Sequence, residues 1–166
     1  TRDFDFVVYL QPKDVDDFNS ELHTLLDDMY ETMIAASGVG LAAIQIAVPL
    51  NVLIINPINE EDIQDKNDLI EAINPKITHK DGELVYQEGC LSVPGFYEDI
   101  TRAKHIVVEY FDRFGEKKTM ECEDFLAVAW QHEMEHLDGH VFIENLSFTK
   151  RQKFEKEWKN KKKSKK

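Results

Sequence analysis

The sequence predicts an α+β domain, because its helical and strand-like segments are grouped along the chain instead of alternating. An amphipathic helical pattern comes first, strand-like runs occupy the middle of the chain, and a second helical pattern follows the strands. With 166 residues, 42% of them hydrophobic, the chain is large enough for one domain with a sizeable core. We see no internal repeat or linker that would mark a second domain.

The first predicted element is a helix near the N-terminus. Apolar residues recur there at the spacing of one helical face, so we expect this face to pack in the core. The members of this stripe are Leu22, Leu25, Leu26, Met29, Tyr30, Met33 and Ile34.

Three later segments have the composition of β-strands. Residues 51–56 and 105–111 are rich in β-branched and aromatic side chains, which favours strands. The second of these runs ends in a turn at residues 112–115, and residues 117–122 are the expected return strand. Residues 60–68 are acidic and polar and predict a surface loop.

The predicted helix at residues 123–137 carries an HExxH motif. On a helix with about 3.6 residues per turn, His132 and His136 lie one turn apart on the same face, so both imidazoles can reach one metal ion. Glu133 follows the first histidine and can act as a general base towards a water on that metal. The neighbouring residues are mostly apolar, and ionisable side chains are costly in such a helix unless they bind or pair with a partner.

A catalytic site of this type usually has a third protein ligand, and several residues after the motif are candidates. His140 continues the spacing, but the helix would rise about 12 Å over the eight residues from His132, which is too far for one ion. The metzincin proteases would have a histidine at position 142, which is Phe142 here. The gluzincin proteases would use a later glutamate, and the chain offers only Glu144, Glu155 and Glu157.

Cys90 is the best remaining candidate for the third ligand. It lies in the segment 88–95 (EGCLSVPG), far from the histidines along the chain. A thiolate with two imidazoles suits Fe(II), Zn(II), Co(II) or Ni(II). The other cysteine, Cys122, follows a strand-like run and is expected to be a packed core thiol.

Three short motifs together resemble the peptide deformylase family. They are GVGLAAIQ at 38–45, EGCLS at 88–92 and QHEMEHLDG at 131–139, in the order typical of the family. The resemblance covers roughly residues 18 to 155. It implies antiparallel β-sheets packed around a central HExxH helix, with an N-terminal and a C-terminal helix. The catalytic domain would be residues 1–149, followed by a basic C-terminal helix or tail at 150–166.

The resemblance also implies a metal-dependent hydrolase. Its substrate would be the N-terminal formylmethionine of newly made proteins, from which it releases formate. Cys90, His132 and His136 would hold one divalent ion, with Fe(II) expected in cells and Zn, Ni or Co as substitutes.

Three further groups would take part in the reaction. Glu133 would pass the proton of the attacking water to the leaving nitrogen. The side chain of Gln45 and the backbone N–H of Leu91 would stabilise negative charge on the formyl oxygen.

The family also implies which residues bind the peptide. Backbone at Val39–Gly40 and Glu88–Gly89 would pair with an extended substrate. Apolar side chains, namely Tyr86, Phe125 and Val128, would line a methionine-sized pocket. Glu88 would in addition orient one of the ligand histidines.

Three positions depart from the usual family pattern. Residue 135 is a glutamate where an aspartate is common, and we expect Glu135 to pair with Arg102. Tyr97 stands where an arginine is common, so contacts at that rim of the site are expected to differ. Residues 4–17 do not match the family's usual opening segment.

The charge is distributed unevenly. The net charge is −12, while residues 150–166 contribute ten Lys or Arg and two Glu, a net +8 that leaves −20 for residues 1–149. An acidic body of this kind argues against DNA binding. We expect the basic end to be a solubilising tail or a final helix anchored by Phe154 and Trp158, and by the resemblance it is a candidate for contact with the ribosome.

Other sequence features indicate where the protein is located and which alternative functions are open. No signal peptide and no apolar run near 18 residues is visible, and two cysteines fit a reducing compartment, so we expect a cytoplasmic protein without a membrane partner. The alternatives are an HExxH metalloprotease or a binding protein with an inert metal site, and Glu133 argues against the latter. Three histidines outside the motifs are expected to be ordinary surface or core residues: His23, His79 and His105.

Overall fold

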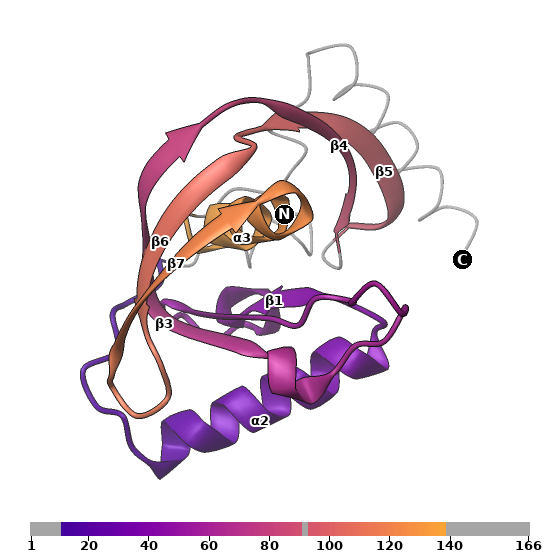
Figure 1. Cartoon of the computed structure of the whole chain (residues 1–166). Coiled ribbons are helices and arrows are strands. Elements are labelled where there is room, and N and C mark those ends of the chain that lie inside the picture. Colours follow the sequence, from indigo (N-terminus) through magenta and orange to yellow (C-terminus); the bar gives the residue numbers. More distant parts are fainter. Residues whose placement is uncertain (1–10, 91–92, 139–166) are drawn as a thin grey trace.

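A computed structural model describes residues 11–90 and 93–138, and among these the side chains of 89, 90 and 93–96 are not described. The described part contains a five-stranded antiparallel sheet in the order β1-β2-β3-β6-β7 and a separate two-stranded sheet, β4-β5 (Figure 1). The strands are β1 Gly40–Ala42, β2 Val52–Ile55, β3 Ile70–Asp81, β4 Leu84–Cys90, β5 Val93–Arg102, β6 His105–Phe111 and β7 Lys117–Glu123. The helices are α2 Ser20–Ala35 and α3 Asp124–Leu137, with short 3₁₀ helices η1 Ala43–Ile46 and η2 Lys66–Asp68. The predicted α+β class with antiparallel sheets is confirmed.

Helix α2 is the predicted amphipathic helix. Asn19 caps it, since its side chain accepts a hydrogen bond from the Leu22 N–H at 3.0 Å. The face that is fully buried is narrower than predicted and consists of Leu22, Leu26, Met29 and Met33. Ile34 was expected in this stripe but is 38% exposed, because it follows Met33 by one residue and therefore points about 100° away from the buried face.

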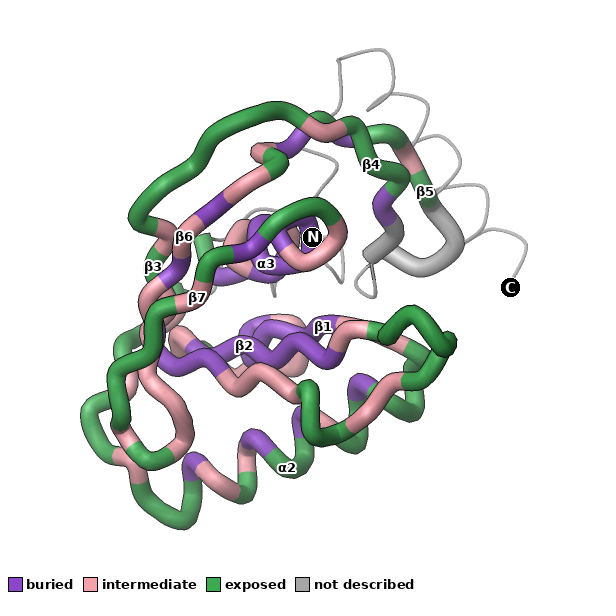
Figure 2. Tube along the Cα trace, viewed as in Figure 1, coloured by how far each residue is buried: buried purple, intermediate pink, exposed green. Residues whose placement is uncertain are grey.

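Strand β2 is buried on both faces, which explains its unbroken run of apolar residues. Leu53 and Ile55 belong to a core shared with α3, whereas Val52 and Ile54 belong to a second core shared with α2. The sheet therefore has α2 on one face and α3 on the other (Figure 1), and the strands between them are the most buried part of the trace (Figure 2).

Strands β6 and β7 form the predicted hairpin. In β6 alternate residues are buried, so Ile106, Val108 and Tyr110 face the core that contains α3. The Tyr110 and Trp130 rings lie 5.4 Å apart between centroids. Cys122, the partner of Ile106 in β7, is a buried free thiol, and burial raises its pKa to about 11, as expected for an inert core residue.

Strands β3, β4 and β5 were not predicted. Strand β3 is interrupted by register shifts, and its second half is largely exposed, so it lacks a regular apolar alternation. Among the described residues no helix is long and apolar enough to cross a membrane. The predicted C-terminal helix and the basic tail lie outside the described residues, as do the ligand candidates at positions 140, 142, 144, 155 and 157.

Candidate metal centre and active site

The two motif histidines lie close together on α3. The Nε2 atoms of His132 and His136 are 3.2 Å apart, and the ring planes are inclined by 76°. One ion held by tetrahedral bonds of about 2.0–2.1 Å keeps its nitrogen ligands about 3.3 Å apart. The pair therefore has the separation of a chelating site.

His136 is kept in the form that can bind a metal. It is buried, and burial, assisted by the nearby His132 and Arg102, holds the pKa of its imidazole well below the ordinary value. A neutral imidazole is the ligating form.

Glu88 on β4 lies within hydrogen-bond distance of the other histidine. Its Oε1 lies 2.7 Å from Nδ1 of His132. Burial tends to raise the pKa of Glu88, but hydrogen bonds from Arg102 and His132 prevail and hold that pKa below its ordinary value. An ionised carboxylate at Nδ1 places the ring proton there and leaves Nε2 as the ligand atom, as in carboxylate–histidine–metal sites.

Arg102 on β5 connects this carboxylate to a second one. Its Nε and Nη2 donate to Glu88 at 2.5 and 2.8 Å, and its Nη1 and Nη2 donate to Glu135 at 2.6 and 3.1 Å. The Arg102 side chain is only 4% exposed, and although burial opposes the charge, the two carboxylates raise the pKa of the guanidinium. The predicted partners Arg102 and Glu135 are thus hydrogen-bonded, while the contact with Glu88 was not foreseen.

Glu133 lies in a tight, buried position beside β1. Its residue exposure is 6%, and its Oε2 is buried with no hydrogen-bond partner among the described residues. Gly40 makes room for it, because a Cβ at that position would lie 2.6 Å from Oε1 of Glu133. Burial raises the pKa of Glu133 to about 7; nearby Glu88 adds to this effect, whereas the charges of His132 and Arg102 oppose it.

A buried carboxylate oxygen without a partner requires an explanation. Glu133 follows His132 directly on the helix that carries both histidines, and this position suits a bound divalent ion with a water molecule. The donor set of the described residues therefore fits the predicted metal.

The third predicted ligand is only partly described. Cys90 ends β4, where its backbone is paired with Val93 after a register shift at Gly89. It follows Glu88 by two residues, and Glu88 is hydrogen-bonded to His132, so the β4 backbone near Cys90 is tied to α3. The side chain of Cys90 and all of Leu91 lie outside the described residues.

The side chain of Gln45 is held by a hydrogen bond within its own segment of the chain. Its Oε1 accepts a hydrogen bond from the Ala42 N–H at 2.8 Å, which fixes the orientation of the amide and makes Nε2 its donor end. The short helix η1 that carries Gln45 contacts both β1 and α3.

Strand β1 has the open edge that substrate addition would need. In the described part of the chain β1 pairs only with β2, and the Val39 carbonyl accepts from the Asn56 N–H at 2.8 Å. Because backbone groups alternate in direction along an antiparallel strand, the N–H and C=O of Gly40 face the other edge. On this strand the backbone N–H and C=O of Gly40 therefore face the edge away from β2, whereas the Val39 carbonyl faces β2.

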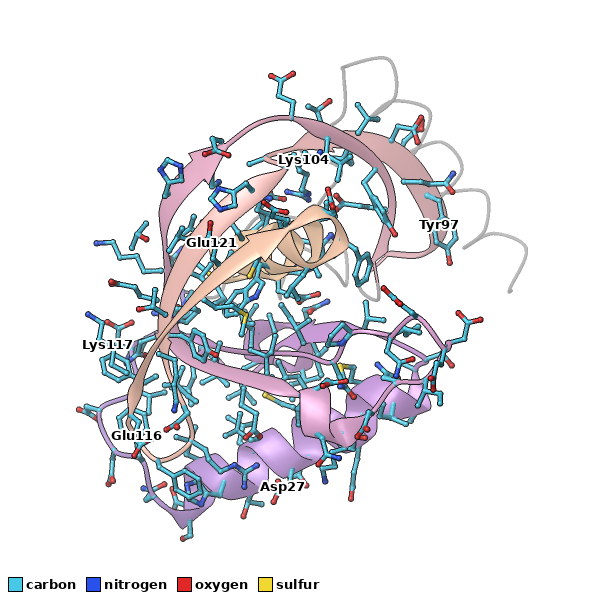
Figure 3. All side chains as sticks on the ribbon, in the orientation of Figure 1. Asp27, Tyr97, Lys104, Glu116, Lys117 and Glu121 are labelled. Atoms are coloured by element: carbon cyan, nitrogen blue, oxygen red, sulfur yellow. The ribbon has the colours of Figure 1, made fainter. Side chains whose placement is uncertain are left out.

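The predicted pocket residues come from two elements. The rings of Tyr86 on β4 and Phe125 on α3 lie 5.8 Å apart between centroids, and Val128 follows Phe125 by one helical turn and is buried. Tyr97 on β5, at the position where an arginine was common, is 64% exposed (Figure 3).

Gln131 was not assigned a role from the sequence. Its buried side chain accepts from the Ala103 N–H at 3.0 Å and donates to the Ala103 carbonyl at 2.8 Å. These bonds fix α3 to the link between β5 and β6, one residue before His132. A polar residue among apolar neighbours was the only available signal for this role.

Comparison with known proteins adds to this geometry. The sequence matches the family model described as polypeptide deformylase over residues 5–152. This chain belongs to the polypeptide deformylase family. The match begins earlier than the motifs alone had suggested and includes most of the N-terminal segment that departs from the usual opening.

Individual members of the deformylase family are similar over most of their length. The peptide deformylase of Campylobacter jejuni is 58% identical over 158 residues, which cover 95% of this chain and 90% of that protein. The peptide deformylase of Nautilia profundicola is 55% identical over 147 residues, which cover 89% of this chain and 84% of that protein.

Solved deformylase structures share the fold. A peptide deformylase from Legionella pneumophila superposes with a TM-score of 0.88 at 38% identity, covering 96% of this chain and 91% of that chain. The peptide deformylase from Ehrlichia chaffeensis, in complex with actinonin, superposes with a TM-score of 0.84 at 36% identity. The superposition covers 93% of this chain and 91% of that chain.

Proposed function

We propose that this chain hydrolyses the formyl amide at the N-terminus of newly made proteins, releasing formate and a free amino group. Membership of the deformylase family supports this reaction. The observation that carries it is the buried Glu133, which has one oxygen without a hydrogen-bond partner among the described residues and lies on the same helix as two histidines at chelating separation.

We assign the metal to Cys90, His132 and His136. Fe(II) is the ion expected in cells, with Zn, Ni or Co as substitutes. When bound, the ion supplies Lewis-acid activation of the attacking water and of the formyl carbonyl. The cysteine is assigned from the resemblance and from its nearness to Glu88 along β4.

The protein groups carry the proton and the developing charge. Glu133 accepts a proton from the attacking water and delivers it to the amide nitrogen as the C–N bond breaks. Burial raises the pKa of Glu133 above that of an ordinary glutamate, which favours a group that first accepts and then returns a proton. Gln45 Nε2 and, by the resemblance, the Leu91 N–H donate hydrogen bonds to the formyl oxygen.

The substrate peptide is placed by the strands around the site. The open edge of β1 at Gly40 would pair with the extended peptide, and Glu88–Gly89 of β4 would contact its other side. Tyr86, Phe125 and Val128 would receive the methionine side chain. We also infer that α3 is the central helix of the domain, since it contacts β1, β2, β6 and β7.

The reaction is tested by formate release. Anaerobic loading of the enzyme with Fe(II) should give formate from a formyl-Met peptide, and treatment with EDTA should abolish it. An unformylated peptide should remain intact. Internal cleavage of that peptide without formate release would instead identify a metalloprotease.

Gly40→Ala tests the contact between β1 and Glu133. The added methyl group would displace the carboxylate, and a misplacement on the order of 1 Å can cost about 10²-fold in rate, so we expect kcat to fall by about that factor. In a Glu133→Gln background the same substitution should cause little further loss, because the group it displaces is already inactive. Equal losses in both backgrounds would contradict this account.

Glu88→Gln tests the orientation of His132. Loss of the carboxylate should raise the dissociation constant of Zn(II) by about 10- to 100-fold, measured by competition with a chelating indicator at one equivalent of metal. Glu83→Gln, at an exposed position just before β4, should leave that constant unchanged. Equal affinities in the two variants would remove the proposed role of Glu88.

The basic tail is a separate proposal. If residues 150–166 contact ribosomal RNA, deletion of 159–166 should weaken co-sedimentation with ribosomes and reduce its dependence on salt. Unchanged binding across a salt series would reject this contact. The absence of DNA and membrane partners and the cytoplasmic location stay predictions from the sequence.

A further inference from the structure

We propose that the chain has a second site for a divalent transition metal, formed by His79 and Asp81 of β3 and His105 of β6. Nε2 of His79 lies 2.7 Å from Oδ2 of Asp81, and Nδ1 of His105 lies 3.2 Å from Oδ1. One ligand atom from each of the three residues lies within 4.8 Å of the other two. The sequence had suggested that both histidines were ordinary surface or core residues.

The strand register creates this cluster. Asp81 pairs directly with His105, and His79 precedes Asp81 by two residues, so all three side chains project from one face of the sheet. That face is opposite α3, because the alternate β6 residues Ile106 and Val108 are the ones packed in the core. The cluster is therefore separate from the HExxH site.

A fourth residue favours metal binding over a simple ion-pair network. Glu121 of β7 (Figure 3) lies with its Oε1 2.6 Å from Nε2 of His105. A carboxylate on the far nitrogen of a histidine fixes the ring and its tautomer, leaving Nδ1 as the ligand atom. Glu88 makes a related contact with His132 of the HExxH motif, but there the carboxylate lies on Nδ1 and Nε2 is the other ring nitrogen.

The geometry needs only small rotations to close on an ion. In this structure the three ligand atoms lie within 4.8 Å of one another. Bonds of about 2.0–2.2 Å to one ion would require the most widely separated of these atoms to move closer together. The side chains of His79 and Asp81 are 55% and 57% exposed, so both can rotate, while His105 is 19% exposed and is held by Glu121. Water would complete the coordination.

The donor set selects the kind of ion. Two imidazoles and one carboxylate suit Zn(II), Cu(II) or Ni(II), whereas Ca²⁺ and Mg²⁺ prefer oxygen ligands. The net charge of −12 favours accumulation of cations near the surface. A preparation exposed to excess Zn(II) would therefore hold two ions per chain, one of them not catalytic.

Calorimetric titration of Zn(II) into the Zn-loaded holoenzyme tests the site. We expect one further equivalent to bind to the unmodified chain. His79→Ala and His105→Ala should each weaken this binding by at least about tenfold, and Glu121→Gln should weaken it by about tenfold. Formate release at one equivalent of metal should be unchanged in all three variants.

Two control variants show whether the effect is specific. Glu109→Gln removes a partly exposed carboxylate from the same strand as His105, and His23→Gln removes a histidine elsewhere. Both variants should bind the second ion normally. The proposal is wrong if the holoenzyme takes up no further ion. It is also wrong if the exposed variant His79→Ala binds that ion as tightly as the unmodified chain.

Discussion

Glu133→Gln is expected to lower kcat for formate release by about 10³-fold, within the range of about 10²- to 10⁴-fold for loss of a general acid–base. Glutamine keeps the size of the side chain, so it should still fit against Gly40. It cannot accept the proton of the attacking water. Metal content should be unchanged, since neither histidine is altered, and rapid kinetics with metal analysis on the same samples measures both quantities.

Asp124→Asn is the matched control for this substitution. Asp124 is the first residue of α3, and its side chain is 64% exposed. Its φ of 52° is tolerated by asparagine, so the variant removes one carboxylate from the same helix without strain. We expect nearly full activity. If Glu133→Gln were as active as this control, the proposed proton transfer would have to be abandoned.

Arg102→Ala should lower the free energy of unfolding by about 3–5 kcal/mol, the usual cost of removing one partner from a buried ion pair. The substitution would leave Glu88 and Glu135 without their shared cation, and the Glu88 side chain is only 4% exposed. Glu88 would also lose the bonds that position it against His132. Urea unfolding measures the first effect, and Zn(II) affinity measures the second.

Arg113→Ala provides the comparison. Its guanidinium also bridges two carboxylates, Glu71 and Asp27, but the Arg113 side chain is 23% exposed and Asp27 is 60% exposed. We expect a smaller loss there, on the order of 1 kcal/mol, because the Arg113 side chain and Asp27 are better screened by solvent than the Arg102 network, although Glu71 is only 16% exposed. Equal losses in the two variants, or full stability and activity of Arg102→Ala, would refute the role given to the buried network.

The elements that the sequence predicted are those with a strong local period. The stripe of α2, the buried run of β2 and the β6–β7 hairpin all depend on residues near one another in the chain. Strand β3 was missed because Pro75 and a register shift interrupt it and because its second half faces solvent. Strands β4 and β5 pair only with each other among the described residues, and of the side chains described there, those of Val85, Tyr86, Gln87, Tyr97, Asp99 and Thr101 are exposed, without an apolar alternation in the sequence.

The features of the candidate site also fall into two groups, those that the local sequence predicts and those that it does not. The separation of His132 and His136 follows from helix geometry and could be predicted locally. The approach of Gly40 to Glu133 depends on how a distant strand meets α3, and the bonds from Arg102 to Glu88 depend on how β5 pairs with β4. No local pattern contains either. The cluster around Asp81 depends on the β3–β6 register, which the sequence did not specify.

The central claim is that one sulfur and two imidazole nitrogens hold the catalytic ion. X-ray absorption on the enzyme with a single equivalent of Zn(II) tests it directly. We predict one sulfur neighbour at about 2.3 Å and nitrogen neighbours at about 2.0–2.1 Å, with the sulfur signal lost in Cys90→Ser and kept in Cys122→Ser. A coordination shell of nitrogen and oxygen alone in the unmodified enzyme, unchanged by Cys90→Ser, would contradict the assignment.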